Sequence, residues 1–300
     1  MDGFGACEIC GGDAWKPVYQ GPVRDGKFGN LTAPTTVAEC DDCGAARLTE
    51  AACHDDDFYA GPDYWASVAG GDGFSNSHEM MDDVELHGLW ADDLSGKTVA
   101  EIGTGAGGFL DQIRELNDPP KTIIAIEPAD ALRPALQAKG FETFAYATDA
   151  AASFAGAVDL ACTFNVIEHV PDPVGFLADA AALLAPDGRL LLSTPNRDDT
   201  LMDLAPAYPQ FFYRTAHRWY FDADSLAACA AQVGLKISRV HYIQRFGLAN
   251  ALVWIRDGKP SSHDSLPGLS DARLDQTWQD NLVRRGVADR LYVVLERVPQ

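Results

Sequence analysis

The chain has 300 residues, 47% of them hydrophobic, and its 44 acidic and 23 basic residues give a net charge of −21. This length and composition predict a globular protein with one catalytic domain and a small accessory module. The negative charge argues against a nucleic-acid partner, and because the sequence has neither a transmembrane-length apolar run nor a signal peptide, we expect a cytoplasmic protein.

Two pairs of cysteines near the N-terminus have the spacing of a metal site. Cys7 and Cys10 form one Cys-x-x-Cys pair, Cys40 and Cys43 form the other, and a glycine follows each pair. Four thiolates supply the closed tetrahedral shell that structural zinc prefers. The sequence therefore predicts a structural Zn²⁺ ion in a zinc-ribbon-like module over 1–60. A redox dithiol is the alternative, which two matched pairs fit poorly.

Strand-like apolar runs alternate with helix-like segments through the middle of the chain. Such alternation is typical of βαβ units and a parallel sheet. We predict a doubly wound, Rossmann-like α/β domain over 61–300, with insertions at 197–220 and 247–288. The expected strands are 98–102, 122–126, 142–146, 158–164, 189–193, 236–243 and 290–296, and the expected helices begin near 108, 131, 173 and 222.

A glycine-rich loop follows the first predicted strand of this domain. Gly103, Gly105 and Gly107 allow a tight turn and a close approach of the backbone to a ligand. Gly103, Gly105 and Gly108 fit the dinucleotide fingerprint G-x-G-x-x-G, so an NAD(P)-dependent oxidoreductase is an alternative. Glu101, just before the first glycine, would oppose a pyrophosphate and favour the ammonium and sulfonium of S-adenosylmethionine.

The ordered motifs of this region resemble those of the class I S-adenosylmethionine-dependent methyltransferases. The resemblance implies S-adenosylmethionine as the cofactor and the doubly wound fold of that family. It covers about 98–244 and includes the glycine loop, an acidic second-strand motif, a segment after the fourth strand and a fifth-strand motif. These segments are VAEIGTGAG at 99–107, IIAIEP at 123–128, NVIEHV at 165–170 and LAPDGRLLLSTPN at 184–196.

Further cofactor-site candidates lie at the ends of the following strands. Glu127 ends the second strand, about 20 residues beyond the loop, where a carboxylate can accept both ribose hydroxyls. The resemblance implies adenine contacts after the third strand, where Asp149 is the candidate. Asn165 follows the fourth strand, at the edge where open α/β sheets bind ligands. The loop itself contributes Glu101, Gly103, Thr104, Gly105 and Gly107 to the predicted cofactor site.

The acceptor side requires alignment of the substrate and, for a hydroxyl, a general base. His217 lies in the aromatic-rich insertion and is our preferred catalytic base, and His169, after the fourth strand, is the second candidate. Arg214 and Arg218 are candidates for binding a phosphate or carboxylate of the substrate.

A zinc module before such a domain resembles the sugar C-methyltransferases that act on nucleotide-linked deoxysugars. Those proteins carry a further C-terminal domain, for which 300 residues leave no room. We expect a small-molecule substrate, methylated on a hydroxyl of a sugar, a nucleotide-sugar, or a related surface-glycan or secondary-metabolite intermediate. C- or N-methylation of a nucleotide-linked sugar is one alternative, and a catalytically inactive zinc-bearing binding protein is another.

Overall fold

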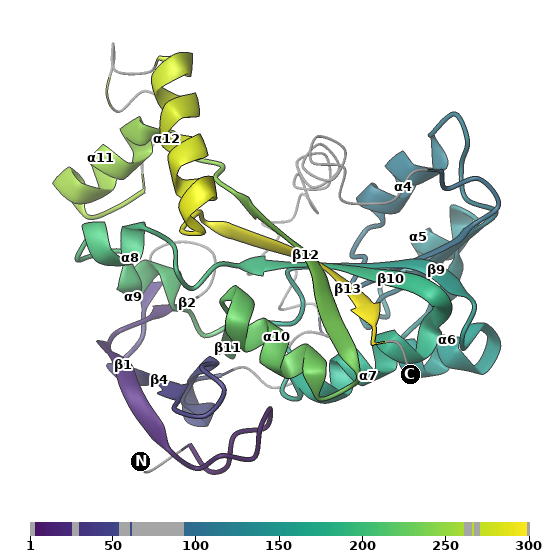
Figure 1. The fold of residues 1–300 in the computed structure, drawn as a ribbon, viewed down its shortest axis with the longest axis horizontal. Coiled ribbons are helices and arrows are strands. Elements are labelled where there is room, and N and C mark those ends of the chain that lie inside the picture. The colour runs from purple at the N-terminus through teal and green to yellow at the C-terminus, as the bar shows by residue number, and fades with distance from the viewer. Residues whose placement is uncertain are drawn as a thin grey trace.

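The computed structural model describes residues 4–25, 30–53, 61, 93–260, 266 and 271–298. Within these ranges the largest element is a seven-stranded sheet with the order β12-β13-β10-β9-β6-β7-β8 (Figure 1). Its strands are β6 (Thr98–Ile102), β7 (Thr122–Ile126), β8 (Glu142–Phe144), β9 (Val158–Phe164), β10 (Leu184–Pro195), β12 (Leu235–Ile243) and β13 (Arg290–Arg297).

The sheet is mostly parallel. Strands β8, β7, β6, β9 and β10 run in the same direction, whereas β13 is antiparallel to both β10 and β12. The chain moves outward from β6 to β8 and then returns to the other side of β6 as β9. This reversal leaves the carboxyl ends of β6 and β9 side by side, which is where ligands bind in open α/β sheets.

Helices cover both faces of the large sheet, as the doubly wound prediction requires. Helices α4 (Gly108–Arg114) and α5 (Arg133–Ala138) contribute to the buried cluster on one face. Helices α6 (Ala147–Phe154), α7 (Pro173–Leu183) and α10 (Ala223–Ala231) contribute to the cluster on the other. Figure 1 shows α4 on the opposite side of the sheet from α7 and α10. The predicted Rossmann-like α/β fold is confirmed.

The starts of two helices follow directly from their capping residues. The carboxylate of Asp172 accepts a hydrogen bond from the Gly175 N–H at 2.8 Å and precedes Pro173, which is favoured in a first helical turn. Asp222 accepts from the Ser225 N–H at 2.8 Å, so the helix predicted to begin there does so.

Two local predictions differ from the structure. The third strand ends at Phe144 instead of residue 146, and the Ala-rich segment after it forms α6, since alanine is the best helix former. The expected strand 189–193 is longer in the structure, because β10 begins at Leu184 and includes the Pro-Asp-Gly stretch at 186–188. A register shift between Leu184 and Arg189 accommodates it in that strand.

A second sheet connects the N-terminal segment to the rest of the chain. It has the order β1-β4-β5-β11. Strand β11 lies at the end of the predicted 197–220 insertion, and its Trp219 pairs with Arg47 of β5. The two parts therefore share one sheet, and the boundary predicted near residue 60 stays a prediction. The bounds are β1 (Trp15–Gly21), β4 (Thr35–Cys40), β5 (Ala46–Leu48) and β11 (Trp219–Tyr220), with β2 (Arg24–Asp25), β3 (Asn30–Leu31) and the 3₁₀ helix η1 (Glu50–Ala52) beside them.

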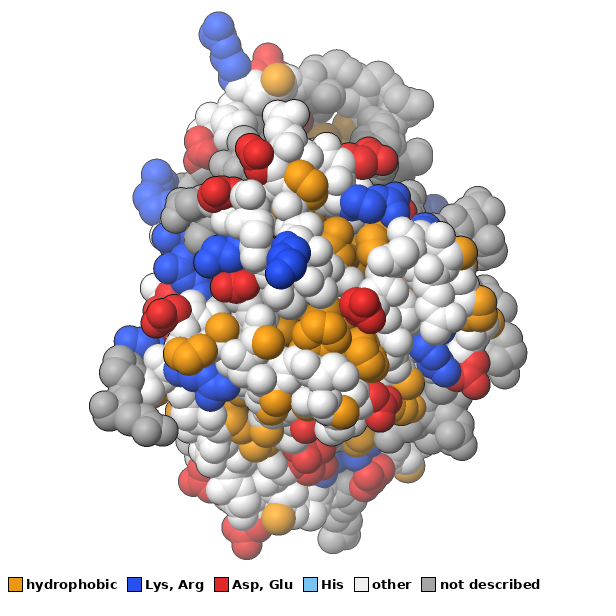
Figure 2. Space-filling view, turned by 90° about the vertical axis from the view of Figure 1, so that its right-hand side faces the viewer, with side chains coloured by type: hydrophobic (Ala, Val, Ile, Leu, Met, Phe, Trp, Pro, Cys, Tyr) orange, Lys and Arg blue, Asp and Glu red, His pale blue; other side chains and the backbone are white. Residues whose placement is uncertain are grey.

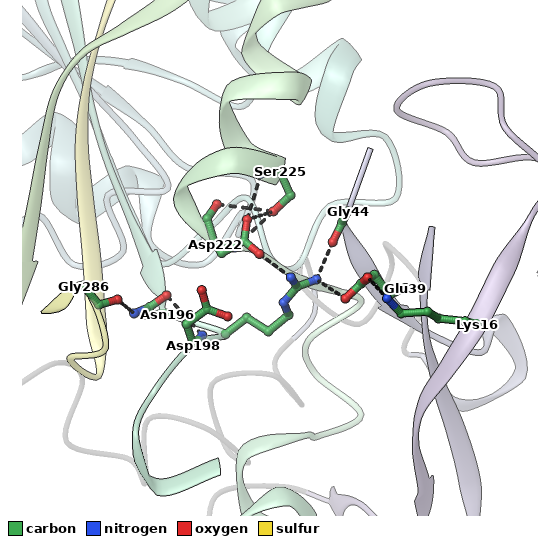
Figure 3. A network of polar contacts seen from close by, with 9 residues as sticks. Lys16, Glu39, Gly44, Asn196, Asp198, Asp222, Ser225 and Gly286 are labelled. Atoms are coloured by element: carbon green, nitrogen blue, oxygen red, sulfur yellow. Dashed lines mark hydrogen bonds and ion pairs between the residues drawn. The ribbon is translucent and has the colours of Figure 1, made fainter. Parts of the chain in front are cut away.

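Arg197 joins the second sheet to the catalytic domain. Its guanidinium donates hydrogen bonds to the Gly44 carbonyl and the Asp222 carboxylate and lies 3.3 Å from Glu39. Figure 3 shows these partners on opposite sides of the network, with Lys16 paired to Glu39 at 2.6 Å. Asp222 also caps α10, so one carboxylate starts a helix of the large sheet and holds the N-terminal sheet.

Both predicted insertions contain helices. The first includes α8 (Leu201–Leu204) and α9 (Pro209–Phe212), and the second includes α11 (Leu248–Asp257) and α12 (Ala272–Arg285), which stand apart from the large sheet at the upper left of Figure 1. Tyr208 and Trp254 pack edge to face, with ring centroids 4.9 Å apart, and so tie the insertions together. None of the helices in the described ranges combines the length and hydrophobicity needed to cross a membrane.

Candidate active site and metal centre

The glycine loop turns sharply at the carboxyl end of β6. Gly103, Gly105 and Gly107 have φ of +79°, +57° and +79°, in the left-handed region that side chains disfavour. A Cβ atom on Gly107 would lie 2.7 Å from a methyl group of Leu136, so space as well as conformation requires glycine there. The loop thus exposes backbone to a ligand at the switch point of the sheet.

Two buried carboxylates lie beside this loop. Glu101 is 3% exposed and accepts a hydrogen bond from the Thr104 hydroxyl at 2.5 Å. Glu127 is 4% exposed and accepts from the backbone N–H groups of Gly105 at 2.8 Å and Ala129 at 2.9 Å. The structure therefore brings both predicted acids to the glycine loop, with Glu127 holding the loop itself.

The electrostatics of these acids favour a cationic ligand. Burial raises the pKa of Glu101 to about 8, with a further contribution from the charge of Glu127, and burial also raises the pKa of Glu127. Within the described part of the chain, neither carboxylate forms an ion pair with a lysine or arginine. The charge of Arg133 offsets the effect of burial on Glu127 only in part. Because burial makes the ionised carboxylates costly, a ligand with an ammonium and a sulfonium fits this site.

The other two cofactor candidates lie at neighbouring strand ends. Asn165 follows β9 with φ +55°, the only positive φ of a non-glycine residue in the described ranges, and its N–H donates to the Ser193 carbonyl at 2.9 Å. Asp149 is exposed in the first turn of α6, where its carboxylate accepts from the Tyr146 N–H at 3.1 Å. Asn165 therefore lies at the ligand edge, whereas one oxygen of Asp149 serves to cap a helix.

A cluster of Glu168, His169 and His217 lies on the acceptor side. Their possible ligand atoms are all within 4.8 Å of one another, and the two imidazole rings meet edge to face with centroids 4.8 Å apart. His169 Nδ1 contacts the Ala216 carbonyl. The backbone carbonyl of Glu168 accepts from the N–H of Arg218, so the insertion is fixed against the segment after β9.

The protonation of the cluster follows from its burial. Desolvation, with a smaller contribution from the charge of Arg214, lowers the pKa of His169 to about 3 and also lowers that of His217. Both imidazoles are thus neutral at neutral pH and able to accept a hydrogen bond, and the lowered pKa makes each a weaker base than a free imidazole. Burial raises the pKa of Glu168 to about 7.

Glu168 belongs to this cluster, although its sequence motif did not single it out. Its Oε2 accepts from the Thr194 hydroxyl at 3.1 Å, but its Oε1 is buried without a hydrogen-bond partner. The signal available in the sequence was an acid directly before His169 in a segment expected to follow a buried strand. That position alone did not show that the side chain points toward His217.

The four predicted cysteine ligands form a second cluster, in the N-terminal module. The sulfur atoms of Cys7, Cys10, Cys40 and Cys43 lie within 4.8 Å of one another. Cys7 Sγ is 3.7 Å from Cys43 Sγ, and Cys10 Sγ is 3.5 Å from Cys40 Sγ. A tetrahedral zinc with ~2.3 Å bonds needs sulfurs ~3.8 Å apart, so these residues fit the metal.

The two cysteine loops have the same backbone geometry. Gly11 and Gly44 have φ of +76° and +75°, and their N–H groups donate to the carbonyls of Cys7 and Cys40 at 2.8 and 2.9 Å. Two loops of one conformation that face each other are an arrangement suited to four-cysteine coordination. Cys53 lies apart from the cluster, with its thiol directed at the Thr49 carbonyl.

Charges are mixed on the face shown in Figure 2. Blue and red side chains alternate there, with hydrophobic side chains gathered near the centre, so no continuous basic surface covers the described part of this face.

Comparisons with known proteins agree with this geometry. A family described as "Methyltransferase domain" matches residues 76–240. Ubiquinone biosynthesis O-methyltransferase of Xanthomonas oryzae pv. oryzae is 30% identical over 133 residues, which cover 42% of this chain and 54% of that protein. The chain thus spans about half the length of these curated relatives. The C-methyltransferase NovU of Streptomyces niveus is 25% identical over 289 residues, which cover 91% of this chain and 65% of NovU.

Solved structures show the same fold. A SAM-dependent methyltransferase from Archaeoglobus fulgidus matches with a TM-score of 0.50 and 13% identity, covering 74% of this chain and 94% of that one. A Haloferax volcanii protein solved in complex with the Trm112 methyltransferase activator matches with a TM-score of 0.52 and 14% identity, covering 79% and 97%.

Proposed function

The chain belongs to the methyltransferase domain family and carries a class I S-adenosylmethionine-dependent methyltransferase domain, and we propose that it methylates a small molecule. The preferred acceptor is a hydroxyl of a sugar, a nucleotide-sugar, or a surface-glycan or secondary-metabolite intermediate. The observation that carries the proposal is the pair of buried acids, Glu101 and Glu127, at a left-handed glycine loop. The nicotinamide alternative finds no support, because both the family match and these relatives are methyltransferases.

The residues around the glycine loop form the cofactor half of the site and hold the cofactor. When bound, the cofactor supplies a methyl group activated by its sulfonium. Glu101 attracts the positive end of the ligand, and Glu127 accepts the ribose hydroxyls through the lone pairs that its backbone hydrogen bonds leave free. The loop brings its N–H groups close to the ligand. Gly103, Thr104, Gly105 and Gly107 line this contact, with Asn165 at the next strand end and Asp149 beyond β8.

The residues around His217 and His169 form the acceptor half of the site and receive the acceptor. His217 is 7% exposed and neutral, so it accepts the hydroxyl proton as methyl transfer proceeds. His169 packs against it edge to face and is the second candidate base. The short segments around both residues are held together by backbone hydrogen bonds from Arg218 and Trp219 to the Glu168 carbonyl, which favours a fixed acceptor geometry.

Methylation of carbon or nitrogen is the second candidate reaction. The similarity to the C-methyltransferase NovU supports it, because that similarity extends over 91% of this chain and includes the N-terminal segment. A base at His217 also serves a carbon acceptor, from which a proton must be removed. The choice between oxygen and carbon therefore depends on the acceptor and not on the base.

The N-terminal module, proposed to span residues 1–60, contains the predicted metal site. We infer that Cys7, Cys10, Cys40 and Cys43 bind a structural Zn²⁺ ion, because four thiolates leave no open coordination position for chemistry. Strand β5 of this module pairs with β11 of the acceptor side, so the metal would stabilise the segment that contains His217.

Calorimetric titration of S-adenosylhomocysteine into the full chain tests the cofactor half, with Glu101→Ala as the variant and NAD as the competing ligand. Micromolar binding that the variant loses and that NAD does not reproduce is the expected result. Methyl transfer from labelled S-adenosylmethionine to a panel of nucleotide-sugars and phenols then tests the acceptor. Cofactor binding without transfer to any member would favour an inactive binding protein.

A further inference from the structure

Arg214 differs from the other arginine predicted to bind a substrate anion. Its side chain forms no ion pair with a described acidic residue. The Nε atoms of both arginines are buried without a hydrogen-bond partner, so the ion pairs are what distinguish them. Arg218 is instead held by Glu50 at 2.6 Å and Glu8 at 3.8 Å. Because a partly buried guanidinium is normally matched by an anion, Arg218 serves the structure and Arg214 is open to a ligand.

A second arginine reaches the same place from the N-terminal module. Arg24 of β2 forms a parallel β-bridge with Arg214: its N–H donates to the Tyr213 carbonyl and its carbonyl accepts from the Thr215 N–H, both at 3.0 Å. Residues opposite each other in such a bridge direct their side chains to the same face. The Arg24 guanidinium lies over the Phe211 ring, 4.1 Å from its centroid.

The backbone holds this arrangement firmly. The Tyr220 hydroxyl accepts from the Arg214 N–H at 3.0 Å and donates to the Arg214 carbonyl at 3.1 Å. Burial and the charge of Arg214 lower the pKa of Arg24 to about 10, so two like charges are kept close together in a poorly solvated place. Two guanidinium groups that reach the same place can contact one anion together.

The pair lies beside the proposed base. The charge of Arg214 contributes to the lowered pKa of His169 and of His217. Glu168 also faces this group, but it forms no ion pair with Arg214 within the described residues. A bound anion would offset the positive potential of Arg214 at the imidazoles. Substrate binding and the base strength of the imidazoles are therefore linked through the contact with Arg214.

We propose that Arg24 and Arg214 form an anion-binding subsite that holds a phosphate or carboxylate group of the acceptor next to His217. This inference rests on the proposed function, because it defines the substrate class of the same site. It also gives the N-terminal module a role in recognition, since the module supplies Arg24. The planar guanidinium groups suit bidentate contacts with either anion.

The test titrates pyrophosphate, inorganic phosphate and malonate into the full chain at constant ionic strength, with and without S-adenosylhomocysteine. The variants are Arg214→Gln, Arg24→Gln and the charge-preserving Arg214→Lys, and Arg256→Gln is the matched control, because that exposed arginine pairs with Asp257. We expect one anion class to bind, with affinity reduced at least ~10-fold in both glutamine variants, less in the lysine variant, and unchanged in the control.

A preference for the phosphates identifies a phosphorylated acceptor, and a preference for malonate identifies a carboxylate. Equal anion affinity in the wild-type chain and in Arg214→Gln would overturn the proposal, as would the absence of anion binding by the wild-type chain. If Arg214→Lys melts at the same temperature as the wild-type chain, misfolding does not explain its reduced anion affinity. Because S-adenosylhomocysteine binding is measured separately, failure of the cofactor half and failure of the anion subsite give different results.

Discussion

The cofactor half and the acceptor half of the site lie at the same edge of the large sheet but are built differently. The cofactor half comes from two adjacent strands, with Glu101 and Glu127 only 26 positions apart, and its buried ionisable side chains are acids. The acceptor half combines Arg24 with His169, Arg214 and His217 from distant segments, and its ionisable side chains are bases apart from Glu168. The cofactor half takes its residues from the large sheet, whereas the acceptor half also takes Arg24 from the N-terminal module, so we expect damage to the module to affect the acceptor half more.

Loss of the zinc site should separate the two halves most strongly. Structural zinc contributes on the order of 10 kcal/mol of folding free energy in small modules, so we expect Cys40→Ser to unfold the module and abolish methyl transfer. Because the cofactor residues lie at the ends of β6, β7 and β9, S-adenosylhomocysteine should still bind within about threefold of its wild-type affinity, an effect no larger than one net hydrogen bond. Metal analysis, circular dichroism and calorimetry measure the three quantities.

Cys53→Ser is the matched control for this variant, because Cys53 lies outside the cluster. It should retain the metal, the stability and the activity. A Cys40→Ser protein with wild-type metal content and activity would refute both the zinc site and its support of the acceptor half.

His217→Ala should damage only the acceptor half. Loss of a general base costs about 10²-fold or more in kcat, and we expect a smaller loss for His169→Ala. The affinity for S-adenosylhomocysteine should not change, since neither imidazole lies at the glycine loop. Steady-state kinetics with the acceptor identified from the panel provides the measurement, and unchanged turnover would remove His217 from the mechanism.

The same contrast explains how much could be predicted from the sequence. The cofactor half was predictable because its constraints are local: a tight turn needs positive φ at Gly103, Gly105 and Gly107, and all three have it. Glu101 and Glu127 follow from the alternation of strands and helices, which fixes which residues meet at the carboxyl edge.

The acceptor half was predictable only in part, because its contacts are non-local. Arg24 and Arg214 are 190 positions apart, and the strands that place them are two residues long or isolated bridges, too short to show any periodicity. From the sequence alone, Arg218 was an equal candidate for binding a substrate anion. Only the structure shows its ion pair with Glu50.

Arg197→Met tests the connection between the two regions. This variant removes the charged hydrogen bonds to Asp222 and Gly44, in a site where the Arg197 and Asp222 side chains are 15% and 14% exposed. We expect the free energy of unfolding to fall by about 2 kcal/mol, measured by urea denaturation, with acceptor turnover reduced and cofactor affinity retained.

The control for that variant is Arg256→Met, whose pair with Asp257 is more exposed. Its effect should stay within about 0.5 kcal/mol, as for other surface pairs. If both variants destabilise the chain equally, the network around Arg197 has no special role in joining the sheets.

The smallest expected effect is the pH dependence of cofactor binding. The pKa of Glu101 is raised to about 8, so the free protein holds this carboxyl group protonated at neutral pH. A cationic ligand favours the ionised form, so binding releases a proton and weakens as the pH falls below 8. The expected slope approaches tenfold in affinity per pH unit, or ~1.4 kcal/mol.

Calorimetry with S-adenosylmethionine between pH 5.5 and 7.0, in two buffers of different ionisation enthalpy, measures both the slope and the released proton. This window lies below the ordinary α-amino pKa of about 8, so the ligand charge stays constant. Glu101→Gln should bind weakly with no slope, and the acceptor-side variant His217→Ala should keep the wild-type slope. A flat wild-type profile would mean that Glu101 does not contact the charge of the cofactor.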